Sequence, residues 1–233
     1  MDSPRNNEQA RLSKWIDSLL SSSLVPSRWR MTTRTGSLLC DCGSIQYDLV
    51  VPPSSQLVEQ TNAVCHCRDC VGFCLALPNG DSYLQNNGSF MVNFYKSDLQ
   101  LVKGRDKLST VRLYPHSAIV RIYCGECHTP LGADLVGAAP ICLVNETLIH
   151  ETYSVRFLPS VVLGYKDALH GTKPYARSVS VKWRNYGPLF LWKSIWRVIW
   201  GWLAGKSRGG FLENDYNRDF PVGLDGLKKV TTQ

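Results

Sequence analysis

Hydrophobic and polar residues alternate through the middle of the chain with a period of two. Ile45, Tyr47 and Leu49 are separated by polar residues, the pattern of a strand with one buried face. Further apolar runs are bounded by Asn-Gly, Lys-Gly and proline turn signals. They predict strands over Ser89–Tyr95, Leu99–Val102, Leu108–Tyr114, Ala118–Tyr123 and Ile141–Val144. We therefore expect a mainly β core of about 130 residues with little helix.

The two ends of the chain have a helical pattern instead. Apolar residues recur at helical spacing near the N-terminus, at Leu12, Trp15, Ile16, Leu19 and Leu20. Residues 188–203 form a second apolar run, which holds four of the seven tryptophans. We therefore expect three sections: an N-terminal helical extension over 1–34, a β domain over 35–172, and a C-terminal extension over 173–233.

The run over residues 188–203 is shorter than a membrane span and carries two cations, Lys193 and Arg197. These cations are four positions apart, so they share one face of a helix, and the remainder of the run is apolar. One interpretation is an interfacial helix that contacts a membrane or a protein partner. The other is a helix that packs on its own domain. For the N-terminal helix, packing on the domain is the favoured interpretation and a partner or membrane contact is the alternative.

Composition and charge set broad limits on partners. The 233 residues are 44% hydrophobic, which suits a globular core, and the net charge is +7 with a pI near 9.0. Such a charge is compatible with nucleic acid, an anionic membrane or an anionic substrate. The basic residues are scattered in singles and pairs, so we do not expect a dedicated nucleic-acid partner.

Nine cysteines point to metal sites rather than disulfides. Their number is odd, and they occur in C-x-C, C-x-C-x-x-C and C-x-x-C arrangements. Residues 1–10 are polar and lack the apolar stretch of a secretory signal. We therefore expect a reducing, cytoplasmic compartment, in which thiols remain available to metals.

Four outer cysteines form two matching pairs, at Cys40, Cys42, Cys124 and Cys127. One pair precedes a predicted strand and the other follows one, and each pair contains or adjoins a glycine that allows a tight turn. Two such turns supply the four thiolates of a closed tetrahedral zinc site. Because the pairs are far apart in sequence, a metal held by both would stabilise the whole core.

A central cluster places three thiols within six residues, at Cys65, Cys67 and Cys70. These cysteines are too close in sequence for good disulfide geometry, and thiolates select zinc and related metals. Three protein ligands with one open position are typical of a reactive zinc, which can lower the pKa of a bound thiol. Cys74, Cys142 or His66 could instead close the shell, and the site would then be structural.

The sequence resembles the glutathione-dependent formaldehyde-activating enzyme family, which includes centromere protein V. The resemblance rests on residues 36–47, 65–70 and 122–132, where all seven cysteine positions appear in the family's order, and it extends over about 36–171. It implies a β-tent of small antiparallel sheets pinned by a four-cysteine zinc. It also implies a second zinc on Cys65, Cys67 and Cys70, and a carbon–sulfur lyase activity that joins glutathione to formaldehyde.

Three neighbouring residues are candidates for roles in this reaction. Arg68 could pair with glutathione carboxylates, or could be an ordinary solvated arginine. His66 and Asp69 could carry protons, or could only stabilise the loop.

Two departures from the family pattern concern His128, which replaces a glycine, and the segment Val71–Leu77. The first needs a left-handed backbone that histidine tolerates, and the second puts the substrate in doubt.

Overall fold

The computed structural model describes residues 11, 14–19, 21, 33–52, 62–135, 141–150, 159–175, 179–182, 188–206 and 210–211. Strands and helices occur in the following order: β1 (Arg34–Leu39), β2 (Gln46–Val51), β3 (Ala63–Cys65), α2 (Arg68–Leu75), β4 (Leu84–Gln85), β5 (Gly88–Tyr95), β6 (Leu99–Lys103), β7 (Leu108–Val111), β8 (Ile119–Cys124), β9 (Pro130–Leu135), β10 (Ile141–Asn145), β11 (Ile149–His150), β12 (Val161–Leu163), β13 (Ser180–Lys182) and α3 (Pro188–Leu203). Short 3₁₀ turns connect several of them, at Gly80–Tyr83, Lys96–Asp98, Arg105–Lys107, Glu146–Leu148 and Tyr165–Asp167.

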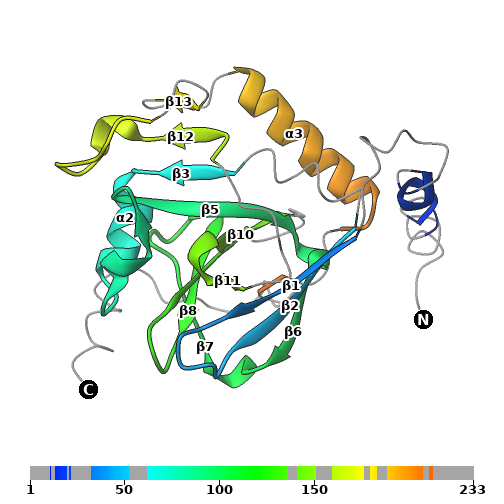
Figure 1. The fold of residues 1–233 in the computed structure, drawn as a ribbon, viewed down its shortest axis with the longest axis horizontal. Coiled ribbons are helices and arrows are strands. Elements are labelled where there is room, and N and C mark those ends of the chain that lie inside the picture. Colours follow the sequence, from blue (N-terminus) through cyan, green and yellow to red (C-terminus); the bar gives the residue numbers. More distant parts are fainter. Residues whose placement is uncertain are drawn as a thin grey trace.

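The strands form two sheets (Figure 1). The smaller sheet has the order β11-β1-β2-β6, and the larger one has the order β13-β12-β3-β5-β10-β9-β8-β7, with β4 paired to β5. Every pairing is antiparallel except those of β12, which runs parallel to both β3 and β13. The expected mainly β fold, built from antiparallel sheets, is confirmed for the described residues.

Side-chain patterns explain the position of individual strands. In β2, buried Tyr47, Leu49 and Val51 alternate with exposed Asp48 and Val50, as predicted for a strand with one face on the core. All eight residues of β5 are buried, because this strand lies between β3 and β10 inside the larger sheet. All six strands predicted for the core are present, the first of them as β2. The main difference is that β7 ends at Val111 rather than at Tyr114.

The helix α2 was not predicted as an element. It begins directly after the central cysteines and buries Cys70, Val71, Phe73 and Cys74. It packs beside β5, and Phe73 and Cys74 belong to a small apolar cluster under this part of the fold. The main core lies between the two sheets and includes Tyr47, Phe90, Phe94 and Leu131. The helix therefore rests on the larger sheet and holds the central cysteines against it.

Both terminal helices of the prediction are present. Residues 14–19 are helical, whereas Leu12 and Leu20 lie outside the described residues. The helix α3 spans Pro188–Leu203, the run predicted from its composition. Beyond it, Ala204, Lys206 and Phe211 are buried, and Phe211 reaches the main core. Within the described part of the chain, no helix is long and apolar enough to cross a membrane.

Candidate metal centres

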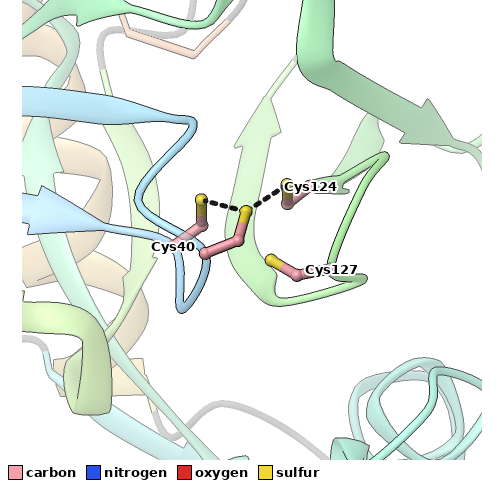
Figure 2. A group of neighbouring side chains, drawn as sticks. Cys40, Cys124 and Cys127 are labelled. Carbon is pink, nitrogen blue, oxygen red and sulfur yellow. Dashed lines mark hydrogen bonds between the residues drawn. The ribbon is translucent and has the colours of Figure 1, made fainter.

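The four outer cysteines converge from the two sheets. Cys40 and Cys42 occupy the turn between β1 and β2, while Cys124 ends β8 and Cys127 lies in the turn that follows (Figure 2). All four Sγ atoms lie within 4.8 Å of one another. The Sγ of Cys42 is 3.5 Å from that of Cys40 and 3.8 Å from that of Cys124. These distances match the edge of a tetrahedron of thiolates around zinc, about 3.8 Å.

Local backbone geometry forms both turns. Gly43 has a left-handed φ of 67°, and its N–H donates to the carbonyl of Cys40 at 2.8 Å. The amide of Ile45 donates to the Sγ of Cys40 at 3.2 Å, a bond that favours the thiolate. In the second turn, His128 has a φ of 60° and its amide donates to Cys124 O. The left-handed backbone expected at His128 is therefore confirmed.

A polar network beside the cysteines also connects the two turns. The amide of Asp41 donates to Oγ1 of Thr129 at 3.2 Å. The hydroxyl of Tyr83 donates to the Asp41 carboxylate and lies 3.3 Å from the same Thr129 oxygen. Thr129 Oγ1 is in turn 3.1 Å from the Sγ of Cys127. The β1–β2 turn is thus bound to the β8–β9 turn by protein contacts in addition to the cysteines.

The three central thiols form a second cluster at the start of α2. Cys65 ends β3, Cys67 is the N-cap of α2, and Cys70 lies in its first turn. Their Sγ atoms lie within 4.8 Å of one another, with 3.2 Å between Cys65 and Cys67. A helix N-terminus stabilises negative charge and so favours thiolates at this position. The arrangement fits a soft metal ion bound by three thiolates from one chain segment.

Arg121 lies in contact with this cluster and was not predicted from the sequence. This residue of β8 is buried, and its Nη2 donates to the Sγ of Cys70 at 3.3 Å. Its guanidinium also lies over the ring of Phe73 in α2. The pKa of the Cys70 thiol is held well below its ordinary value by hydrogen bonds with Cys65 and Cys67, and Arg121 adds to this effect. A fixed positive charge therefore accompanies the three thiols.

The candidate fourth ligands do not join the cluster. Cys74 is buried one helical turn beyond Cys70, in the apolar cluster that contains Phe73 and Tyr123. Cys142 is buried in β10, with its Sγ 3.7 Å from the carbonyl oxygen of Phe94. His66 is buried with its Nε2 2.8 Å from the hydroxyl of Tyr175. Among the described residues, the group contains only Cys65, Cys67 and Cys70.

Other predicted site residues lie around the cluster. Arg68 is exposed at the first position of α2. Asp69 is half-buried, and its Oδ1 accepts a hydrogen bond from the hydroxyl of Tyr114 at 2.8 Å. Gly164 packs so closely on Cys67 that a Cβ atom there would lie 2.8 Å from the Cys67 nitrogen. The turn after β12 therefore covers one side of the cluster, while Arg68, Asp69 and Tyr114 border an accessible side.

The buried His66 belongs to an aromatic group rather than to the accessible side. Its ring makes edge-to-face contacts with Tyr165 and Tyr175, with centroids 5.7 and 5.8 Å away. Burial lowers the pKa of His66, which favours the neutral imidazole. Its backbone amide donates to Leu163 O at 2.8 Å and so continues the pairing of β3 with β12. These contacts give His66 a clear role in holding the cysteine segment.

Comparisons with known proteins bear on the family and not on the activity. No curated protein matches the chain. A crystal structure of a Rhodobacter sphaeroides protein is similar over 52% of this chain and 90% of its own, with 14% identity and a TM-score of 0.36. Residues 32–164 match the model of a family of unknown function, DUF6151, and include all seven clustered cysteines. Since this match covers more than half of the 233 residues, the chain belongs to the DUF6151 family.

Proposed function

We propose that the protein is a zinc-dependent carbon–sulfur lyase that joins a small-molecule thiol to a small aldehyde at the three-cysteine cluster. One observation carries this proposal: Cys65, Cys67 and Cys70 converge, and no further histidine, cysteine, aspartate or glutamate of the described residues joins them. A metal held by three protein ligands keeps a position for an exogenous ligand, as reactive zinc sites do. The four-cysteine cluster would then hold a structural zinc.

The donor sets support zinc as the metal for both clusters. Thiolates favour zinc over hard cations, and in the four-cysteine cluster the Sγ–Sγ distances of 3.5 and 3.8 Å suit tetrahedral geometry. When bound at the three cysteines, zinc supplies the ability to hold a substrate thiol as its thiolate at neutral pH. Arg121 supports this chemistry because its charge balances the single net negative charge that three thiolates leave on a divalent ion.

Residues at the accessible side can then position the substrates. Arg68 is exposed and is suited to pair with a carboxylate of a peptide thiol such as glutathione. Asp69 and Tyr114 are joined by a hydrogen bond beside the cluster, so this pair can hold or pass a proton. His66 is a weaker candidate for proton transfer, because its Nε2 is already bonded to Tyr175. Its catalytic role stays a prediction.

The reaction balances without an oxidant or a reductant. The sulfur of the thiol forms a bond to the carbonyl carbon, and the carbonyl π bond breaks. The proton released from the thiol ends on the new hydroxyl oxygen. With glutathione and formaldehyde, the product is S-hydroxymethylglutathione. The resemblance of the cysteine motifs to the formaldehyde-activating family supports this substrate pair, whereas the apolar segment Val71–Leu77 leaves room for another aldehyde.

Exchange NMR tests the proposal directly. Zinc-loaded protein is added to glutathione and formaldehyde at equilibrium with their adduct, and the interconversion rate is measured. We expect a rate above the uncatalysed background that Cys67→Ser abolishes and that Cys74→Ser, a buried cysteine outside the cluster, leaves in place. If the wild-type protein with two bound zincs adds no rate for glutathione with formaldehyde or other small aldehydes, the lyase proposal is wrong.

A further inference from the structure

The outward face of α3 is apolar where its side chains are described, from Trp192 to Leu203. Its exposed large side chains are Trp192, Ile195, Trp196, Ile199, Trp202 and Leu203. They recur at intervals of three and four residues, so they form a single stripe on the helix. The three tryptophans are 65%, 58% and 56% exposed. Contiguous exposed apolar surface of this kind marks a contact site.

The opposite face of α3 attaches the helix to the protein. Arg197 and Gly201 are buried, and the hydroxyl of Tyr95 at the end of β5 donates to the carbonyl of Arg197 at 3.2 Å. The following segment continues this attachment, since the amide of Ser97 donates to the carbonyl of Lys206 at 3.3 Å. The cation Arg197 therefore faces the protein while tryptophans face outward. In an ordinary surface helix the apolar side chains face the protein and the charged side chains face solvent, so α3 has the opposite arrangement.

The sequence on both sides of α3 carries charge of one sign. No aspartate or glutamate occurs between Asp167 and Glu213, while eight lysines and arginines do. These eight positive charges already exceed the net charge of +7 of the whole chain. The basic character of the protein is therefore concentrated in this region. Arg197 and Lys206 are buried, so the charge available to anionic headgroups comes from the other six cations of this segment, with no acidic residue there to repel them. Tryptophan prefers the boundary between headgroups and acyl chains.

We propose that the outward face of α3 docks the protein on the surface of an anionic lipid bilayer. The helix has 16 residues, about 24 Å, and lies in the plane of the interface with its tryptophans inserted among the headgroups. We take the bilayer rather than a protein as the occupant because the basic segment around the exposed tryptophans holds no acidic residue that anionic headgroups would repel. This surface is separate from the cysteine clusters, so docking does not depend on the proposed lyase activity.

Vesicle flotation with the full-length, zinc-loaded protein tests this proposal. The probes are vesicles of phosphatidylcholine alone and of phosphatidylcholine mixed with phosphatidylserine. We expect flotation with the mixed vesicles only, weakened by salt, together with a blue shift of tryptophan fluorescence. The variant Trp192→Ser/Trp196→Ser/Trp202→Ser should lose at least about tenfold in partitioning. These residues are exposed, so circular dichroism and zinc content should be unchanged.

A matched control separates α3 from general surface hydrophobicity. Trp15 in the N-terminal helical segment is 60% exposed, close to the values for the α3 tryptophans. Trp15→Ser should leave flotation unchanged. Equal loss with Trp15→Ser, or no flotation of the wild-type protein with anionic vesicles, would overturn the proposal. Dimerisation that the triple variant abolishes, without vesicle binding, would likewise overturn it and assign the face to a second copy of the chain.

Discussion

Arg121 donates a hydrogen bond from Nη2 to the Sγ of Cys70 across 3.3 Å, and both residues are buried. The pair joins β8 to the first turn of α2. Three thiolates on a divalent metal carry one net negative charge, which burial penalises unless a cation is near. The guanidinium supplies that cation and also fixes the orientation of one ligand. Arg121 is therefore a residue outside the cysteines that directly supports the second cluster.

Replacing Arg121 by methionine should weaken metal binding at the second cluster. Loss of a residue that orients a ligand and balances its charge typically lowers metal affinity about 10- to 100-fold. The measurement is zinc release to a chelator, followed by a chromogenic reporter. Arg68→Met is the matched control, since Arg68 is an exposed arginine in α2, the helix that carries Cys70. Equal zinc release from Arg121→Met and wild type would contradict the assigned role.

The two clusters should differ in their contribution to stability. The outer cysteines join the β1–β2 turn of one sheet to the β8–β9 turn of the other, across 82 positions between Cys42 and Cys124. The central cysteines lie within six residues and close no long loop. We expect Cys124→Ser to lower the free energy of unfolding by several kcal/mol, because metal binding at such a site contributes to folding. Cys67→Ser should have a much smaller effect.

Native mass spectrometry and thermal unfolding together check this contrast. The Cys67→Ser protein should retain one zinc and unfold cooperatively near the wild-type temperature. The Cys124→Ser protein should be poorly folded or should melt at a far lower temperature. If both variants lose stability equally, then the central cluster is also structural and the proposed open position loses its support.

Cys74 and Cys142 should not contribute to metal binding. Both thiols are buried, and burial raises the pKa of each, that of Cys74 to about 11. A thiol with a raised pKa is a poor metal ligand at neutral pH unless the metal itself displaces the proton. We expect Cys74→Ala and Cys142→Ala each to bind two zincs by native mass spectrometry. A variant that bound only one zinc would identify the residue as a missing fourth ligand.

The local features of this chain could be predicted from its sequence, and so could the meeting of the two outer cysteine pairs, because a shared metal-ligand pattern connects them. Most other long-range contacts could not. Strands such as β5 and the cysteine pairs depend on patterns within a few residues, and both were predicted at the observed positions. Strands β3 and β12 have three residues each and pair in parallel across the chain, so periodicity gives little signal for them. Their pairing is set by tertiary contacts between positions that are widely separated in the sequence.

Arg121 illustrates the same limit at the candidate site. It lies 51 positions from Cys70, so no motif connects the two residues. One signal was present, because Arg121 is a charged residue inside the apolar strand β8. Buried charges in strands need partners, but the sequence does not say which partner. The helix α2 was missed for a related reason: its residues were interpreted as a metal-binding loop, and its helical form depends on packing against β5.

The C-terminal segment should be part of the folding unit, because Phe211 completes the main core. Its ring packs edge-to-face on Tyr47 with centroids 5.2 Å apart, and its carbonyl accepts a bond from the Tyr47 hydroxyl at 3.3 Å. The preceding Gly210 has a φ of 77°, and its amide donates to the carbonyl of Lys96 at 2.8 Å. These contacts bring a residue from beyond α3 into the space between the sheets.

Phe211→Ala should therefore lower the free energy of unfolding by about 3–5 kcal/mol, the usual cost of removing a buried phenylalanine ring. Urea denaturation followed by circular dichroism measures this loss. Leu169→Ala is the control, because Leu169 is exposed and its truncation should cost less than about 0.5 kcal/mol. A Phe211→Ala protein as stable as the control would mean that the core is complete without the C-terminal segment. A large loss would instead link the stability of the β domain to the attachment of α3, since the segment that carries Phe211 follows directly from that helix.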